Sequence, residues 1–371
     1  MIYLDNGATS FPKPPEVTSA VEHYMRYCGA SAGRSAHKRA REAMEIATSC
    51  RLAVAELINA ENPEDIIFVK NATEGLNIII RGILHRGDKV TVSPLEHNSV
   101  MRPLYASCAE ISVLPLTADG RTDVEYLEGI DEDTALVVIN HVSNVSGALN
   151  DIYRAGEICQ KLGIPLLADC SQSAGHFPID VQRLQGSVVF PGHKGLLGPQ
   201  GTGVMYVHHD ISPVALCYGG TGSDSENMHQ PRTMPDYYES GTLNLMGIAG
   251  LLTGVEYVTG HFAEIEEKEK EFSHMLREGL GNMKRVRLIA PDLHSYGAVI
   301  SFTADHMQPS EIALLLDEKY DIAVRSGLHC APAAHKAYGT LSSGAVRLTP
   351  GCFNTQRDIS VALDAINNIL K

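Results

Sequence analysis

A lysine at the end of a predicted buried strand is the residue of this sequence best suited to do chemistry. The segment VVFPGHKGLLGP brings a β-branched run to Lys194, and glycines follow at once. Glycines let other groups approach the backbone closely, and a desolvated lysine can lose its proton and form a Schiff base with a carbonyl. An ordinary exposed loop lysine fits this segment equally well. If Lys194 is reactive, the carbonyl we expect is the aldehyde of pyridoxal phosphate (PLP).

An aspartate ends another predicted strand upstream of Lys194. Asp169 closes the apolar run Pro165–Asp169 and is followed by the residues CSQ. Ligands of open α/β sheets bind at the carboxyl ends of the strands. A carboxylate there could pair with a protonated pyridine nitrogen and keep the ring an electron sink. Asp before Ser and Gln is also good helix N-capping chemistry, but the downstream lysine favours the functional interpretation.

Two further polar residues follow predicted strands. Thr73 opens a predicted helix after the run Ile66–Val69. Its hydroxyl and the free N–H groups of the first helical turn could bind a phosphate, although a capped helix explains the same residues. His97 follows the run Lys89–Val92. It could stack on a planar cofactor ring or have only a structural role.

A cysteine and an arginine near the C-terminus form a second group. The segment RSGLHCAP places Cys330 in a glycine-containing loop, just after a strand predicted to end at Arg325. A partly exposed thiol with cationic neighbours is the setting of a reactive thiolate. A buried core thiol suits Cys108 and Cys159 better, since both lie in predicted helices. Arg347 could bind a substrate carboxylate with its planar fork, or form a surface ion pair.

Composition argues against several kinds of partner and site. The chain has 371 residues, 30 of them basic and 44 acidic, with a formal net charge of −14. This charge argues against nucleic acid, whose phosphates require a basic face. The 8 cysteines include no C-x-x-C pair. We therefore predict neither a structural zinc site, nor any other metal site, nor a disulfide framework.

The sequence offers no signal for a membrane or for secretion. Its first residues, MIYLDNG, lack the basic and apolar regions of a signal peptide. The apolar stretch Leu243–Val255 is too short to span a bilayer and predicts a buried helix. We expect a soluble, cytoplasmic protein with no membrane partner.

Short apolar runs alternate with amphipathic stretches between about residues 66 and 207, which predicts an α/β domain with a mostly parallel sheet. Predicted strands in this part are Ile66–Val69, Lys89–Val92, Ser112–Leu116, Ala135–Asn140, Pro165–Asp169, Ser187–Phe190 and Gly203–Val207, and predicted helices include Glu74–Leu84 and Ile152–Leu162. The runs are nearly continuous in Val, Ile and Leu, which is typical of strands covered on both faces.

The pattern changes after about residue 243. A long helix to about Leu280 precedes a strand at Ala298–Phe302, a helix at Pro309–Tyr320, a strand at Ile322–Arg325 and a helix at Thr355–Leu370. We therefore predict a large cofactor-binding domain over residues 16–245. A smaller α+β domain would comprise residues 1–15 and 246–371 and carry Cys330.

The ordered series of motifs resembles the class V aminotransferase-like, fold-type I PLP enzymes. More narrowly, it resembles the second group of cysteine desulfurases, whose relatives include selenocysteine lyases. The motifs, in chain order, are YLDNGAT from Tyr3, GRSAH from Gly33, ATE from Ala72, Glu96-His97, Asn144, Asp169 with Gln172, Gly192-His193-Lys194, Ser240-Gly241-Thr242, RSGLHCA from Arg325, and Arg347. The resemblance covers essentially the whole chain. It implies the PLP-dependent transferase fold type I, with a mostly parallel seven-stranded sheet.

The resemblance also implies a role for each matching residue. Lys194 would bind PLP as a Schiff base and act in catalysis, and His97 would stack on the ring and also act in catalysis. Asp169 would pair with the pyridine nitrogen, and Gln172 would contact the ring hydroxyl. Ala72, Thr73 and His193 would hold the phosphate, with Thr242 supplied by the other subunit of a homodimer that shares its active sites. Arg347, Asn144, Arg34 and His37 would bind substrate, and Cys330 would accept sulfur.

Several residues depart from the family pattern. Pro191 and Ala72 stand where hydroxyl side chains are usual, so the phosphate site would depend more on Thr73, His193 and Thr242. Cys170 replaces a small residue beside Asp169 and could be a second thiol near the cofactor. The run Leu348–Cys352 also differs from the usual sequence after the arginine.

The resemblance implies conversion of L-cysteine to L-alanine, with sulfur passed through a persulfide on Cys330 to an acceptor protein. Selenocysteine lyase is the first alternative, since selenium leaves more readily than sulfur. A PLP-dependent aminotransferase or β-lyase acting on another amino acid is the second. A non-enzymatic sulfur-carrier scaffold is disfavoured by intact Lys194, Asp169 and Arg347.

Overall fold

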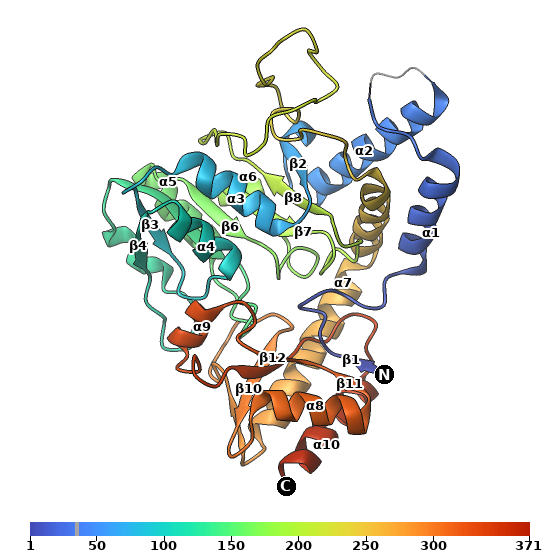
Figure 1. Ribbon diagram of the computed structural model, residues 1–371. Helices are drawn as coiled ribbons and strands as arrows, with labels where there is room; N and C mark the ends of the chain where they lie inside the picture. Colours follow the sequence, from blue (N-terminus) through green and yellow to red (C-terminus); the bar gives the residue numbers. More distant parts are fainter. Residues whose placement is uncertain (34–36) are drawn as a thin grey trace.

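A seven-stranded sheet forms the centre of the larger part of the molecule. The structure is a computed structural model that describes residues 1–33 and 37–371 (Figure 1). The strand order is β2-β8-β7-β6-β5-β3-β4, and β8 runs antiparallel to both of its neighbours, β2 and β7. The strands are β2 (Ile66–Val69), β3 (Lys89–Val92), β4 (Glu110–Val113), β5 (Thr134–Asn140), β6 (Leu166–Asp169), β7 (Ser187–Pro191) and β8 (Gly203–Tyr206). The predicted mostly parallel sheet of an α/β fold is confirmed.

Helices cover both faces of this sheet, and the core is divided accordingly. Val137 of β5 packs into one cluster of buried residues and its neighbour Val138 into another, because successive side chains of a strand point to opposite faces. This double burial explains the continuous apolar runs of the sequence. The helical segments here are α1 (Pro15–His23), a π-helical turn (Tyr24–Cys28), α2 (Lys38–Leu57), α3 (Ala72–Ile83), α4 (Asn98–Ala106), α5 (Ile152–Leu162), α6 (Val181–Leu184) and 3-10 helices at Pro63–Asp65 and Val124–Gly129.

A smaller group of elements lies below the large sheet in Figure 1. Its antiparallel sheet has the order β12-β13-β10-β9, and a parallel pair joins β1 to β11. The strands are β1 (Ile2–Tyr3), β9 (Val286–Leu288), β10 (Ile300–Ala304), β11 (Ile322–Ala323), β12 (Arg325–Gly327) and β13 (Ala345–Leu348); the helices are α8 (Pro309–Tyr320), α9 (Pro332–Ala337) and α10 (Gln356–Leu370). The first residues of the chain therefore pack with the last hundred.

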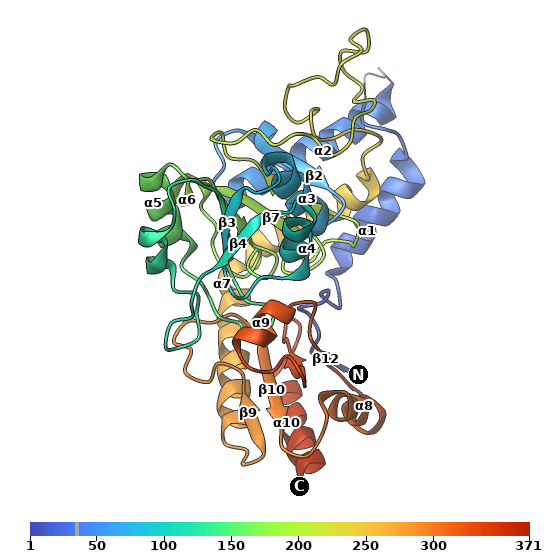
Figure 2. The ribbon, with the colours of Figure 1, turned by 60° about the vertical axis from the view of Figure 1, so that its left-hand side comes forward.

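The long helix α7 (Leu245–Gly281) joins the two parts (Figure 2). Near its start, Ile248 and Leu251 belong to the core of the large sheet, whereas Phe272 and Leu276 near its end belong to the core of the small one. His261 between them has non-helical backbone angles. The predicted domain boundary at residue 245 stays a prediction.

One predicted strand is divided in the structure. Ile322 and Ala323 pair with β1, whereas Arg325 begins β12, which pairs with β13. The prediction that a strand ends at Arg325 was therefore wrong, because a change of pairing partner leaves no trace in the apolar pattern. Among the described helices, none has the length and apolar character needed to cross a bilayer.

Candidate active site

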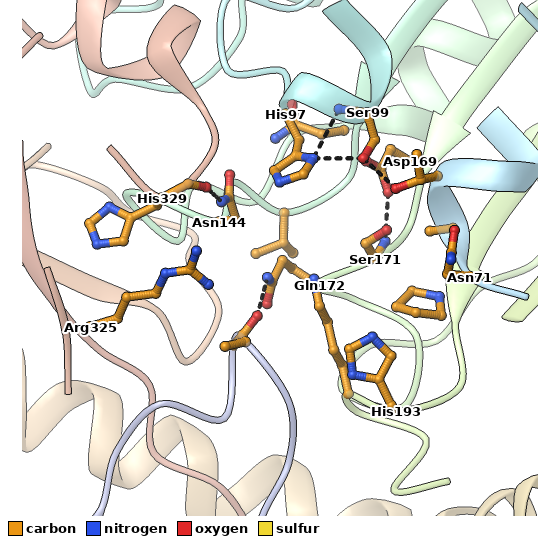
Figure 3. Close-up of a pocket in the computed structure, with 18 of the residues that line it drawn as sticks. Asn71, His97, Ser99, Asn144, Asp169, Ser171, Gln172, His193, Arg325 and His329 are labelled. Atoms are coloured by element: carbon orange, nitrogen blue, oxygen red, sulfur yellow. Dashed lines mark hydrogen bonds between the residues drawn. The ribbon is translucent and has the colours of Figure 1, made fainter. Parts of the chain in front are cut away.

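A cleft of about 220 Å³ opens at the carboxyl ends of β5, β6 and β7. It brings together most of the predicted site residues: Ala72, Thr73, His97, Asn144, Asp169, Gln172, His193, Lys194 and Arg347. Figure 3 shows Arg325 and His329 on one side of the cleft and Asn71 and His193 on the other. Segments from all parts of the chain therefore converge on one site.

Lys194 lies just beyond the end of β7 and lines the cleft. Burial, together with the nearby charges of Arg347 and Arg325, lowers the pKa of its ammonium to about 8 against the opposing effect of Asp169. An unperturbed lysine has a pKa of about 10.4. Lys194 thus has a much larger share of neutral amine near neutral pH than a surface lysine.

Asp169 is the last residue of β6 and is only 4% exposed. Its Oδ1 accepts a hydrogen bond from the backbone N–H of Ser171 at 2.9 Å. No helix begins there, so the helix-capping alternative was wrong. Nearby, Nε2 of Gln172 donates to the carbonyl oxygen of Gly7 at 2.9 Å, which attaches the N-terminal segment to the floor of the cleft.

His97 lies at the N-cap of α4 and faces the cleft. Its Nδ1 accepts a hydrogen bond from the backbone N–H of Ser99 at 3.0 Å. Burial lowers the pKa of the imidazole to about 4, so the ring is neutral at physiological pH. A hydroxyl–hydroxyl contact of 2.7 Å joins Ser99 to Thr73 at the start of α3.

The start of α3 and His193 form a region suited to an anion. The first N–H groups of a helix have no partner within the helix and favour negative charge. Nδ1 of His193 is buried and has no hydrogen-bond partner among the described residues. Burial, followed by nearby Lys194 and Lys13, lowers the pKa of His193 to about 4, so the neutral ring offers one N–H. Pro191 also lines this side of the cleft and supplies no hydroxyl.

Arg347 of β13 is 1% exposed, so the surface ion-pair alternative was wrong. Its Nη2 donates to Oδ1 of Asp5 at 2.8 Å, and its Nη1 donates to the carbonyl oxygen of Asn144 at 3.1 Å. Its buried Nε has no partner among the described residues. The guanidinium therefore retains donor capacity toward a ligand. Sequence reasoning missed Asp5, although it lies within the N-terminal motif.

Cys330 lies in the loop between β12 and α9 and is exposed. Arg325 Nη2 is 3.7 Å from its Sγ. Its carbonyl oxygen accepts a hydrogen bond from the backbone N–H of Asn98 at 2.7 Å, and Asn144 Nδ2 donates to the carbonyl oxygen of His329 at 2.8 Å. The loop is therefore fastened to the rim of the cleft.

Three expectations about His329 and the other cysteines differ from the structure. His329 is not a cationic neighbour, because burial lowers its pKa to about 3. Cys108 is exposed rather than buried, since it follows the end of α4 in a left-handed turn. Cys170 is buried beside Asp169, and burial raises the pKa of its thiol, which disfavours a second reactive thiolate.

Some predicted residues lie outside this cleft. Thr242 is exposed and lines a separate cleft with Lys70 and Ser240. His37 caps α2, where its Nδ1 accepts from the backbone N–H of Ala40 at 3.2 Å, and it does not line the cleft. Arg34 lies outside the described residues.

The donor set of the cleft fits PLP. A lysine with a lowered pKa is available for the aldehyde, and a buried aspartate is available for the ring nitrogen. The start of α3 and the unpartnered Nδ1 of His193 suit a phosphate, while the unpartnered Nε of Arg347 suits a carboxylate. The remaining site is polar, as a charged amino-acid adduct requires.

Comparisons with known proteins agree with this geometry. The family model described as aminotransferase class-V matches residues 2–361. A probable cysteine desulfurase of Pyrococcus abyssi (strain GE5 / Orsay) is 32% identical over 385 residues, which cover 100% of this chain and 94% of the relative. A cysteine desulfurase of Escherichia coli O7:K1 (strain IAI39 / ExPEC) is 31% identical over 390 residues, covering 100% of this chain and 93% of the relative.

Solved structures give the same result. The apo structure of cysteine desulfurase from Thermococcus onnurineus NA1 superposes with a TM-score of 0.92 at 30% identity, over 100% of this chain and 94% of the other. The cysteine desulfurase CsdA from Escherichia coli gives 0.87 at 26% identity, over 99% of this chain and 94% of the other. The resemblance identified from the sequence motifs is confirmed: the chain belongs to the class V aminotransferase family.

Proposed function

We propose that this chain is a PLP-dependent cysteine desulfurase that converts L-cysteine to L-alanine and receives the sulfur on Cys330 as a persulfide. One observation carries the proposal. An exposed thiol, 3.7 Å from the guanidinium of Arg325, lies at the rim of the cleft that Lys194 lines. Relatives named cysteine desulfurase that match the whole length of the chain support it.

The residues that would hold PLP follow from the donor set. Lys194 would bind the aldehyde, Asp169 the ring nitrogen, and Thr73, His193 and the start of α3 the phosphate; His97 would cover the ring. When bound, PLP supplies an electron sink that makes the Cα proton of an attached amino acid acidic. The neutral imidazole of His97 adds no charge that would oppose the protonated ring.

Arg347 and Lys194 would handle the substrate. The guanidinium of Arg347 would bind the α-carboxylate and so fix the orientation of Cα. Lys194 would take the Cα proton, since its lowered pKa lies near physiological pH and suits a general base and acid. The same amine could then return a proton to the product.

Cys330 would take the sulfur. Its thiolate attacks the substrate sulfur, so that an S–S bond forms while the Cβ–S bond breaks. The electron pair of the broken bond stays on the substrate, where Cβ gains a proton and alanine is released. L-cysteine and the Cys330 thiol thus give L-alanine and a Cys330 persulfide, with no other oxidant or reductant.

The proposal extends to partners and location. A persulfide must be unloaded onto an acceptor, and the exposed position of Cys330 suits transfer to an acceptor protein. We also propose a homodimer that shares its active sites, with Thr242 reaching the phosphate site of the partner subunit. A reducing cytoplasm would keep the described free cysteines as thiols.

The decisive experiment measures both products. The PLP-loaded protein is incubated with L-cysteine, alanine is quantified, and the persulfide is located by mass spectrometry. We expect alanine and a persulfide on Cys330. Cys330→Ala should keep the cofactor absorbance and lose both products, whereas the matched variant Cys170→Ala should retain both.

Other outcomes would point to other functions. Formation of a keto acid instead of alanine would indicate an aminotransferase or β-lyase. Alanine formation from selenocysteine that is unaffected by Cys330→Ala, with no reaction on cysteine, would indicate a selenocysteine lyase. A PLP-loaded protein that is inactive on every amino acid tested would contradict an enzymatic role.

A further inference from the structure

Residues 5–13 form an N-terminal strap that passes under the cleft (Figure 3). Its contacts with Arg347 and Gln172 were described above. In addition to these contacts, the strap forms hydrogen bonds with the turn that follows β7 and carries Lys194. The proposed function gives no role to Lys13, which lies at the end of the strap.

The strap holds both backbone carbonyl groups that flank the Cα of Lys194. The carbonyl oxygen of His193 accepts from the backbone N–H of Ser10 at 3.0 Å, from Thr9 Oγ1 at 3.2 Å and from Lys13 Nζ at 2.9 Å. Ser10 Oγ donates to the carbonyl oxygen of Lys194 at 2.9 Å and accepts from Lys13 Nζ at 2.6 Å. A carbonyl oxygen has two lone pairs, so the neutral donors alone would satisfy it.

The ammonium of Lys13 is unusual because it is half-buried and pairs with no carboxylate. The described residues place no acidic oxygen within salt-bridge distance of its Nζ. Burial lowers its pKa to about 8. Burying an uncompensated cation costs free energy, and a neutral side chain would fill this space without that cost. We therefore looked for a role of the Lys13 charge other than filling space.

We propose that Lys13 is a positioning residue for Lys194: its ammonium, bonded to the His193 carbonyl and the Ser10 hydroxyl, fixes the turn from which the lysine side chain enters the cleft. Charge-assisted hydrogen bonds are about twice as strong as neutral ones. The Lys194 side chain is flexible, so a fixed Cα narrows the range of positions that its Nζ can reach. Loss of the clamp would let the turn move relative to the strand ends that hold the rest of the site.

Covalent capture of PLP by Lys194 tests the proposal without any amino-acid substrate. The cofactor-free protein is mixed with PLP, and capture is followed by absorbance; borohydride reduction and mass spectrometry then locate the label on Lys194. Lys13→Met should slow capture about tenfold, since small misplacements of reacting groups have effects of at least this size. Amide hydrogen exchange should also quicken at Leu197 and Gly198, whose N–H groups close this turn.

Two controls separate positioning from general stability. Lys13→Arg keeps a cation and should restore most of the capture rate. Lys284→Met removes an exposed lysine elsewhere and should change neither capture nor exchange. Wild-type capture and exchange in Lys13→Met would overturn the proposal. If that variant does not fold, Lys13→Gln keeps a side chain of similar length with a neutral donor in place of the cation, and an unchanged capture rate there would overturn the proposal instead.

The inference rests on the PLP chemistry of the proposed function but not on its substrate. A protein that captures PLP at Lys194 yet yields no alanine from cysteine would refute the desulfurase proposal and leave this one standing. Conversely, fast capture in Lys13→Met with normal desulfuration would refute only the role of Lys13.

Discussion

Buried Arg347 and partly buried Asp5 form an ion pair in which Nη2 of the guanidinium lies 2.8 Å from Oδ1 of the carboxylate. The two residues come from opposite ends of the chain and meet at the cleft. Burial lowers the pKa of Arg347, and the Asp5 charge opposes that effect. The Asp5 carboxylate therefore offsets part of the free-energy cost of burying this cation beside the substrate site.

Replacing Arg347 with lysine should weaken substrate binding. A lysine keeps the charge but loses the planar fork that binds a carboxylate with two hydrogen bonds. We expect the KM for L-cysteine to rise about tenfold, equivalent to about 1.4 kcal/mol, with unchanged cofactor absorbance. Steady-state kinetics measure this, with the exposed Arg357→Lys as the control. An unchanged KM would mean that another group binds the carboxylate.

Replacing Asp5 with asparagine should destabilise the cofactor-free protein. Arg347 would then be buried without a counter-charge, and breaking a buried pair by removing one partner costs several kcal/mol. Because Asp5 is partly exposed, we expect a smaller loss, on the order of 2 kcal/mol, seen as a lower Tm in thermal unfolding. The exposed Asp317→Asn should leave Tm unchanged. A wild-type Tm in Asp5→Asn would show that the pair contributes nothing net.

The pH dependence of PLP capture should reveal the lowered pKa of Lys194. The protonated amine cannot attack an aldehyde, so capture should increase with pH up to the pKa of about 8 and level off above it. An unperturbed lysine would instead gain rate up to about pH 10.4. Absorbance-monitored capture between pH 6 and 10 distinguishes the two curves, and Lys194→Arg should show no covalent capture at any pH.

Much of this fold could be predicted because the large sheet is covered on both sides. The runs Ile66–Val69 and Lys89–Val92 were predicted with the boundaries that the structure has. The first is apolar throughout, and the second has three consecutive β-branched residues after Lys89. Strands near the small sheet were harder. The stretch Ile322–Arg325 changes partner within four residues, and pairing depends on distant segments rather than on local pattern.

The site could be predicted where residue type and strand position act together, as at Asp169 and Lys194. The site could not be predicted where two residues far apart in the sequence meet only in the folded chain. Asp5 and Lys13 resemble surface charges in the sequence, and only the fold brings them to Arg347 and His193. Likewise, nothing in the sequence distinguishes Cys108, which the structure exposes, from the buried Cys159.

Thr242 provides a test of shared active sites. In this chain it is exposed and outside the cleft of Lys194, so a role at the phosphate requires a second subunit. Thr242→Val should weaken PLP binding about tenfold, because a hydrogen bond to a charged group contributes about 1.5–3 kcal/mol. Absorbance titration with PLP measures the affinity, and light scattering measures the mass of the assembly.

Mixing two variants then shows whether Thr242 acts in the site of its own subunit or in that of the partner subunit. In a mixed dimer of Lys194→Ala with Thr242→Val, only the site whose lysine comes from the Thr242→Val chain can capture PLP. If sites are shared, that site receives an intact Thr242 from the Lys194→Ala chain. We expect covalent capture there with wild-type affinity, although neither variant achieves it alone. If Thr242 acted within its own subunit, the same mixture would keep the weak affinity of Thr242→Val, because the capturing chain would still lack its hydroxyl. A monomer in light scattering would contradict shared sites directly.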